Sequence, residues 1–341
     1  MSLALSKNVL KLSWIRCRNI STTKQRCRKV TLIGAAGGIG APCLMLLKMN
    51  TMIKELNAVD MNKVIPGVGM DASHMNFPAK TRGFVSPEGL QEGLCNADIV
   101  VITAGVPRKP GMSRDDLFKV NADIIKSTAE CCAEVCPDAF VVIVTNPLNS
   151  VVPIFCKVME KQKKLNPNKI FGCTTLDNVR ASTFVGQLKN IDPREICVPV
   201  VCGHSGETIV PIFSQTKGKI KIELKPNEVA ELTKHVQDAG TEIVKAKAGG
   251  GSATLSMAFS AARFTNSILK AMKGETDVVE CAYVKADIAG CKYFATPLIL
   301  GPCGVQKNLG IPDLSTYEKC LLEKGIESLK KSIEKGEAYV K

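Results

Sequence analysis

The chain has 341 residues, a hydrophobic content of 45% and a formal net charge of +13 at pH 7. This length suits two domains, each with a sizeable core. The hydrophobic content is ordinary for a soluble globular protein. No apolar stretch reaches the ~20 residues that a membrane-spanning helix needs, so we expect no membrane partner.

The positive charge lies mostly at the N-terminus. Residues 1–30 contain eight Lys and Arg residues, and the first acidic residue is Glu55. Without those eight the net charge is 13 − 8 = +5, so a nucleic-acid partner loses most of its support. A basic, acid-free segment with Ser, Thr and spaced apolar residues is typical of a mitochondrial transit peptide. We therefore expect residues 1–27 to be a transit peptide and the mature protein to lie in the mitochondrial matrix. A disordered basic tail is the alternative.

Fifteen cysteines are scattered through the chain without a C-x-x-C pair, and there are only three histidines. Most of the cysteines lie in apolar runs, as Cys43, Cys197 and Cys202 do. We expect them to be small buried hydrophobic residues in a reducing compartment, and we expect no metal site.

A glycine-rich turn organises the first half of the chain. A strand is predicted at 30–33 and a helix at 41–49, with the spacing Gly34-x-x-Gly37-x-x-Gly40 between them. In such a unit the backbone N–H groups at the helix N-terminus can hold a pyrophosphate. A glycine-rich turn can also be only a turn, so this pattern needs a second feature. The residues assigned to the dinucleotide turn are Gly34, Ala35, Ala36, Gly37, Gly38, Ile39 and Gly40.

The second feature is Asp60, which ends a predicted strand at 56–59 and lies 20 residues after Gly40. An acid in this place can accept hydrogen bonds from the adenosine ribose hydroxyls. It would also repel a 2′-phosphate, which favours NAD over NADP. The alternative is an ordinary solvated acid at a strand end. Both features together predict an NAD site.

Strands and helices alternate through the first half. Further strands are predicted at 99–103 and 140–145, with a helix at 114–136 between them. This alternation predicts an α/β fold with a Rossmann-type doubly wound parallel sheet. We assign residues 28–172 to an NAD-binding domain, whose ligand should lie at the carboxyl ends of the strands.

The second half has a different pattern. A helix is predicted after Asp177, and paired strands are predicted at 196–201 and 208–213. Successive strands followed by helices predict an α+β catalytic domain, which we assign to residues 173–341. Further helices are expected at 227–247, at 254–272 and from Tyr317 onwards, and further strands at 278–284 and 293–300.

Three side chains of this second half could perform chemistry. His204 ends an apolar strand, while Asp177 and Arg180 lie three residues apart on one face of a helix. Asp177 could accept a hydrogen bond from His204 and fix its tautomer. Arg180 could hold a substrate carboxylate with its planar guanidinium. The alternatives are a structural histidine and an exposed ion pair of little energetic value.

Two turns at predicted strand ends carry further candidates. The segment 105–114 places Arg108, Lys109 and Arg114 among prolines and glycines. This composition suits a lid that brings cations onto an anionic substrate and excludes water. Asn146 could hydrogen-bond the reacting oxygen or the nicotinamide. A solvated basic turn and an Asx turn are the alternatives.

A series of short motifs runs through nearly the whole chain after residue 29. The motifs are Gly-Ala-Ala-Gly-Gly-Ile-Gly (34–40), Pro-Gly-Val (66–68), Asp71 with Ser73 and His74, Val-Pro-Arg-Lys-Pro-Gly-Met (106–112), Val-Asn-Ala (120–122), Thr-Asn-Pro-Leu-Asn-Ser (145–150), Thr-Thr-Leu-Asp-x-Val-Arg (174–180), Gly-His-Ser-Gly (203–206) and Gly-Ser-Ala-Thr-Leu-Ser-Met-Ala (251–258). In their order and spacing the chain resembles the NAD-dependent malate dehydrogenases of the mitochondrial and bacterial type, within the lactate/malate dehydrogenase family.

The resemblance implies reversible oxidation of L-malate to oxaloacetate, a reaction of the tricarboxylic acid cycle, with NAD as the cofactor. It implies that His204 accepts the proton and that Asp177 is its partner. It also implies a homodimer, the common state of the family. The implied substrate-binding residues are Arg180 for the carboxylate beside the reacting carbon, Arg108 for the distal carboxylate, Arg114 for the carbonyl oxygen and Asn146. The implied cofactor-binding residues are Gly34 to Gly40, Asp60, Asn121, Val144, Thr145, Asn146 and Met257.

The chain departs from the family pattern at a few positions. Asn178 stands where an apolar residue is usual, Cys202 where glycine is usual and Leu148 where valine is usual. The segment 60–67 is about one residue longer than the pattern. None of these changes removes a charged or proton-transferring group.

Two other functions are kept as alternatives. A lactate-type 2-hydroxy-acid dehydrogenase would act on a monocarboxylate, which needs no cation at Arg108. A non-catalytic protein with a dinucleotide fold could bind RNA through basic patches, but it would not need Asp177, Arg180 and His204 together.

Overall fold

The computed structural model describes residues 28–106 and 114–340. The expected transit peptide at 1–27 and the expected lid residues 107–113, which include Arg108 and Lys109, lie outside the described residues. Arg114 is described only as the first backbone position of a helix.

Six parallel strands form the first half of one large sheet. They are β1 (Lys29–Ile33), β2 (Glu55–Asp60), β3 (Lys80–Val85), β4 (Ile99–Ile102), β5 (Phe140–Ile143) and β6 (Ile170–Gly172). Their order is β3-β2-β1-β4-β5-β6. The order reverses between β1 and β4, which is the point where doubly wound sheets bind ligands. The predicted Rossmann-type sheet is therefore confirmed.

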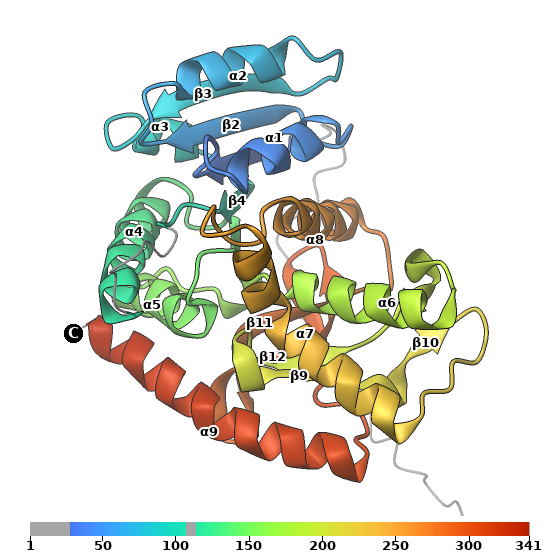
Figure 1. Cartoon of the computed structure of the whole chain (residues 1–341). Coiled ribbons are helices and arrows are strands. Elements are labelled where there is room, and N and C mark those ends of the chain that lie inside the picture. The colour runs from blue at the N-terminus through green and yellow to red at the C-terminus, as the bar shows by residue number, and fades with distance from the viewer. Residues whose placement is uncertain (1–27, 107–113, 341) are drawn as a thin grey trace, which may run out of the picture.

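Helices cover both faces of these strands (Figure 1). Val100 and Ile102 of β4 belong to one apolar cluster, whereas Ile99 and Val101 belong to the other. Alternate residues of a strand point to opposite faces, so this division means that both faces are buried. The connecting helices are α1 (Gly40–Lys48), α2 (Ile65–Ser73), α3 (Leu90–Leu94), α4 (Arg114–Val135) and α5 (Leu148–Lys161).

The second half continues the same sheet with antiparallel strands. Its strands are β7 (Ile196–Cys197), β8 (Val200–Cys202), β9 (Ile209–Pro211), β10 (Lys217–Gly218), β11 (Val278–Ile288), β12 (Cys291–Gly301) and β13 (Gly304–Asn308). β11 pairs with β6, where Tyr283 lies opposite Gly172, and β12, β8 and β9 follow in turn. β7 and β10 form a separate two-stranded sheet.

The helices of the second half surround these strands. They are α6 (Thr175–Lys189), α7 (Pro226–Ala246), α8 (Leu255–Lys273) and α9 (Thr316–Tyr339), with short 3-10 helices η1 (Pro167–Lys169), η2 (Pro193–Glu195), η3 (Gly206–Thr208) and η4 (Phe213–Gln215). In Figure 1, α9 runs along the lower edge of the molecule and α8 lies near its centre. No helix of the described residues combines the length and the hydropathy needed to cross a bilayer.

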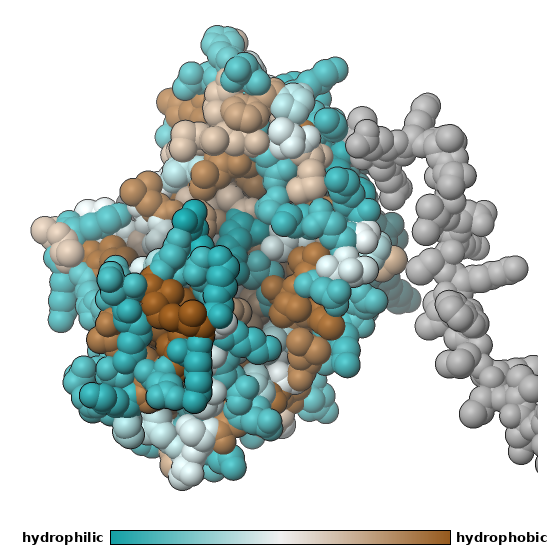
Figure 2. Space-filling model, turned by 90° about the vertical axis from the view of Figure 1, so that its right-hand side faces the viewer, coloured by the Kyte–Doolittle hydropathy of each residue, from teal (hydrophilic) through white to brown (hydrophobic). Residues whose placement is uncertain are grey.

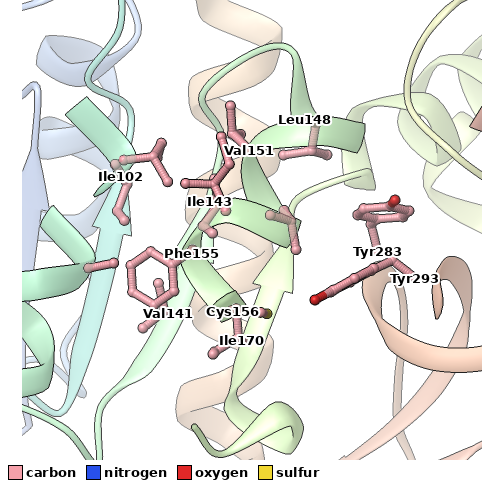
Figure 3. Close-up of a cluster of buried hydrophobic side chains, with 14 of the residues drawn as sticks. Ile102, Val141, Ile143, Leu148, Val151, Phe155, Cys156, Ile170, Tyr283 and Tyr293 are labelled. Atoms are coloured by element: carbon pink, nitrogen blue, oxygen red, sulfur yellow. The ribbon is translucent and has the colours of Figure 1, made fainter. Parts of the chain in front are cut away.

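The core that supports the site joins both halves. Figure 3 shows Ile143 of β5 and Leu148, Val151 and Phe155 of α5 in one cluster, with Tyr283 beside them. Phe155 and Tyr283 are fully buried. Burying one such large apolar side chain contributes about 1.5–3 kcal/mol. This cluster therefore packs α5 against β11, and β6 lies between β5 and β11 in the sheet. On the surface, Figure 2 shows separate hydrophobic patches among hydrophilic residues.

Most predicted elements are present, but one predicted strand is wrong. The expected strand at 196–201 is divided by Val198 and Pro199 into β7 and β8. Only β8 pairs with β9 as predicted, whereas β7 pairs with β10. Proline lacks the N–H that a continuous ladder needs, which accounts for the division.

Candidate active site

The predicted catalytic residues meet in one cavity. A cavity of about 250 Å³ is lined by residues of the glycine-rich turn, of the turn after β5, of α6, of the turn after β8 and of α8. It brings together six of the predicted residues: Ile39, Asn146, Asp177, Arg180, His204 and Met257. Both halves of the chain therefore contribute to this candidate site.

His204 and Asp177 form a buried pair in this cavity. The side chain of Asp177 is fully buried and that of His204 is 10% exposed. Nδ1 of His204 lies 2.5 Å from Oδ2 of Asp177. If Nδ1 donates its proton to this carboxylate, Nε2 remains as the ring nitrogen that can accept a proton. The predicted hydrogen bond between the two residues is present.

Arg180 lies beside this pair, at the limit of the distance for an ion pair with Asp177. Its Nη1 is 4.0 Å from Oδ1 of Asp177, and its side chain is 11% exposed. Oδ1 of Asp177 has no hydrogen-bond partner among the described residues. Burial lowers the pKa of Arg180, and the nearby Asp177 carboxylate opposes this shift. A guanidinium still stays charged at neutral pH, so Arg180 can bind an anion in the cavity.

Asn149 holds the turn that carries His204, a role that the sequence reasoning missed. Its Oδ1 accepts the backbone N–H of His204 at 2.8 Å. Its Nδ2 donates to the hydroxyls of Ser205 and Thr208, both at 3.1 Å. Tyr283 donates to the backbone carbonyl of Asn149 at 3.2 Å. Asn149 lies in the 145–150 motif, but no signal in the sequence connects it with a turn 55 residues away.

The glycine-rich turn has the geometry of an anion cradle. Gly34 has φ +85°, and a Cβ there would lie 2.5 Å from the backbone nitrogen of Ala104. A Cβ at Gly40 would lie 1.9 Å from the carbonyl oxygen of Gly34. Within the described residues, the N–H groups of Gly38 and Ile39 have no acceptor. Free N–H groups at the start of α1 are suited to a phosphate.

Asp60 lies next to this turn and braces it. Its Oδ2 accepts the backbone N–H of Ala36 at 2.9 Å, and its Oδ1 accepts that of Asn62 at 2.9 Å. Each carboxylate oxygen can accept more than one hydrogen bond, so Asp60 keeps acceptor sites for the predicted contact with the ribose hydroxyls. The bond to Ala36 was not predicted.

Asn121 connects two of the predicted loops. Its Oδ1 accepts the N–H of Val106 at 2.8 Å, and its Nδ2 donates to the carbonyl of Asn146 at 2.7 Å. Asn121 is buried, as are Val144 and Thr145 at the end of β5. These contacts fix Val106 and Asn146 relative to each other.

The described cysteines and histidines were compared with the predictions made for them. In the described parts of the chain, no group of three or more His, Cys, Asp or Glu residues could hold a metal ion. Cys43 and Cys202 are buried as predicted, and burial raises the pKa of the Cys43 thiol to about 12. The prediction for Cys197 is wrong, because this residue lies exposed in the short strand β7.

Comparisons with known proteins identify the family to which both halves of the chain are similar. The lactate/malate dehydrogenase NAD binding domain matches residues 28–172, and the lactate/malate dehydrogenase alpha/beta C-terminal domain matches residues 174–340. The chain is 49% identical over 324 residues to the mitochondrial malate dehydrogenase of Sus scrofa, with 95% of each chain covered.

Solved structures of similar fold come from both branches of this family. A malate dehydrogenase of Cryptosporidium parvum has a TM-score of 0.78 and 29% identity, with 92% of this chain and 99% of that chain covered. A lactate dehydrogenase of Cryptosporidium parvum, in complex with lactic acid and β-nicotinamide adenine dinucleotide, has a TM-score of 0.77 and 25% identity. The match covers 90% of this chain and 98% of the lactate dehydrogenase chain.

The hydrogen bonds of Asn149 generate a stability prediction. We expect Asn149→Ala to lower the free energy of unfolding by about 2–4 kcal/mol, because the His204 N–H and two hydroxyls lose a buried partner. Chemical denaturation would measure this change. The matched control is Asn227→Ala, at an exposed position on α7, which should stay within ~0.5 kcal/mol of wild type. Equal changes in both variants would contradict the assigned role of Asn149.

Proposed function

Because the chain belongs to the lactate/malate dehydrogenase family, we propose that it is the NAD-dependent L-malate dehydrogenase of the mitochondrial matrix. The main support for this proposal is the buried His204–Asp177 pair, which lines one cavity together with Arg180 and with Ile39 of the glycine-rich turn. Mitochondrial malate dehydrogenases that are 48–49% identical over 95% of the chain support the activity and the compartment. On this assignment, residues 1–27 are the transit peptide, 28–172 the NAD-binding domain and 173–341 the catalytic domain.

The residues present fit a bound NAD. The free N–H groups of Gly38 and Ile39 can donate hydrogen bonds to the pyrophosphate. The Asp60 carboxylate, which would bind the ribose, accepts a hydrogen bond from Ala36 of the same turn. Met257 of α8, together with Asn146, would border the nicotinamide end. When bound, NAD+ supplies the acceptor for the hydride that leaves carbon 2 of malate.

His204 would act as the proton acceptor in malate oxidation. As the C2–H bond breaks and the hydride leaves, Nε2 takes the proton of the C2 hydroxyl and the C2–O bond becomes a carbonyl. Asp177 holds the imidazole in the required tautomer and stabilises the imidazolium that forms. In oxaloacetate reduction the same proton returns to the substrate oxygen.

The arginines would bind the dicarboxylate. Arg180 faces the cavity and would hold the carboxylate next to the reacting carbon. Arg108 would hold the distal carboxylate, and Arg114 would polarise the carbonyl of oxaloacetate. Asn146 would hydrogen-bond the reacting oxygen. The roles of Arg108 and Arg114 are assigned from their places in the family motifs. The roles of Arg180 and Asn146 are supported also by their places in the lining of the cavity.

A rate comparison tests this function against the lactate-type alternative. With NADH, we expect kcat/KM for oxaloacetate to exceed that for pyruvate by at least ~10²-fold, because pyruvate leaves the Arg108 cation unpaired. In Arg108→Gln, kcat/KM for oxaloacetate should fall far more than that for pyruvate. NADPH in place of NADH is the cofactor control. Equal losses on both substrates would remove Arg108 as the selectivity residue, and a wild-type preference for pyruvate would exclude the proposed function.

A second prediction addresses the proton acceptor. We expect His204→Asn to lower kcat by about 10²–10⁴-fold, because no group then accepts the hydroxyl proton. NADH affinity, measured by fluorescence titration, should change less than about twofold. The matched control is His74→Asn, at an exposed position just after α2, which should keep wild-type kcat. If the His204 variant keeps near-normal turnover, another group carries the proton.

We also propose that the active form is a homodimer built on α1 and α8. These two helices pack side by side, and Met45 and Met49 of α1 and Phe259 of α8 are each 46–49% exposed. A hollow of about 400 Å³ between them is lined by Met49, Phe259 and Ala262. Exposed apolar side chains clustered on two adjacent helices are typical of a protein interface. A second copy of this chain is the occupant that the family resemblance indicates.

Sedimentation of the purified protein tests the dimer. We expect Phe259→Glu to weaken self-association by at least ~100-fold, because a carboxylate would be buried in an apolar interface. The matched control is Tyr317→Glu on α9, where the aromatic ring is 42% exposed and far along the chain from α1 and α8. A monomeric wild type, or equal weakening in both variants, would rule out this surface.

A further inference from the structure

Another cavity lies at the N-terminal ends of the parallel strands, at the opposite end of the sheet from the active site. It has a volume of about 730 Å³ and is lined by the N-terminal ends of β2 and β3, by Arg28 just before β1, and by the C-terminal end of α8. The active site lies at the other end of the same sheet, where Ile39 follows β1 and Asn146 follows β5. Along α8, Met257 borders the active site and Met272 borders this second cavity, so the two are about 22 Å apart along the helix axis.

Positive charge converges on this cavity from four separate segments. Its lining includes Arg28, Lys54, Lys80 and Lys273. Three of these lie at the start of neighbouring strands: Lys54 donates its N–H to the carbonyl of Arg28 at 3.0 Å, and Lys80, which lies opposite Glu55 in register, donates its N–H to the carbonyl of Lys54 at 2.9 Å. Neighbouring strands lie about 4.8 Å apart and all four residues line the same cavity, so their side chains can contact one small ligand.

These positive charges are not neutralised by ion pairs with acidic residues of the described chain. Glu55 is the one acidic residue in the lining, and its carboxylate already lies 3.4 Å from Lys29 and 3.1 Å from Arg82. Within the described residues, Lys80 and Lys273 have no ion-pair partner. The ammonium of Lys54 reaches only the carbonyl of Thr51, at 3.4 Å.

The end of α8 does not require these lysines as caps. Cations often lie at a helix C-terminus because its last carbonyls are unpaired. Here Arg28 donates to the carbonyl of Met272 at 2.9 Å. The N–H of Gly274 pairs with the carbonyl of Ala271, and the N–H of Glu275 pairs with that of Lys270. The carbonyls of Lys270, Ala271 and Met272 are therefore paired with other groups, and the ammonium groups of Lys54, Lys80 and Lys273 remain available for a ligand.

We propose that this cavity is a binding site for a small polyanion that carries two or more phosphate or carboxylate groups. Like charges held together without counter-charges repel one another, and an anion with several oxygens would relieve this repulsion. The volume is in the range of small-molecule sites. Leu269, Met272 and Met52 add an apolar wall for the ligand's carbon skeleton. The site is distinct from the proposed malate and NAD sites.

Calorimetric titration of the mature protein, residues 28–341, tests this site without the basic residues of the proposed transit peptide. The protein is first saturated with NADH, so that the glycine-rich turn is filled, and is then titrated at constant ionic strength with tripolyphosphate or with tricarballylate. Thr51 and Met52 line both this cavity and the hollow of the proposed dimer surface, so the assembled protein is used. Binding of tripolyphosphate alone would identify a phosphate site, and binding of tricarballylate alone a carboxylate site.

Two triple variants with the same loss of charge separate a built site from general attraction. We expect Lys54→Gln/Lys80→Gln/Lys273→Gln to weaken binding at least tenfold. The control, Lys319→Gln/Lys324→Gln/Lys331→Gln on the exposed side of α9, should bind as wild type does. Both should keep wild-type kcat and melting temperature without ligand. If the first triple variant does not fold, Lys80→Gln alone should weaken binding measurably. No binding by wild type, or equal weakening in both triple variants, would overturn the proposal.

Discussion

The site depends on a carboxylate that is completely removed from water. A buried charge is tolerated only where it is paired and hydrogen-bonded. Oδ2 of Asp177 meets that requirement through His204 at 2.5 Å, while Oδ1 has no hydrogen-bond partner in the described residues and lies 4.0 Å from Arg180. Moving His204 away would leave a buried anion poorly compensated. The burial of Asp177 therefore fixes the imidazole and directs Arg180 toward the same cavity.

The scaffold keeps this pair together through contacts between the two halves of the chain. Asn149 of α5, in the first half, binds the backbone of His204 in the second half. Tyr283 of β11 in turn donates to the carbonyl of Asn149, and β11 pairs with β6 to make the sheet continuous. The glycine-rich turn and the catalytic turn are thus attached to one sheet. Their relative positions follow from strand pairing rather than from loop conformation.

The sequence was informative where a pattern is local. Apolar runs predicted β1, β2, β4 and β5, and the glycine spacing predicted the dinucleotide turn. β3 was missed because its sequence Lys-Thr-Arg-Gly-Phe-Val is largely polar and half-exposed, and α5 was missed because Pro153 lies inside it. The pairing of β6 with β11 and the contact of Asn149 with His204 join residues more than 50 positions apart. No local pattern encodes such contacts, so the arrangement of the site needed the structure.

Two departures from the family pattern lie close to the catalytic pair in the sequence: Asn178 follows Asp177, and Cys202 lies two residues before His204. The hydrogen bonds and strand pairing around them keep the backbone in place. Asn178, next to Asp177, is buried, and its Nδ2 donates to the carbonyl of Val198 at 2.9 Å, which ties α6 to the chain leading into β8. Cys202 has φ +82°, in the left-handed region that favours glycine and costs other residues about 1 kcal/mol or more. It keeps this backbone because β8 is paired with β12 on one side and β9 on the other. The two-sided pairing, rather than a glycine, sets the path of the chain into His204.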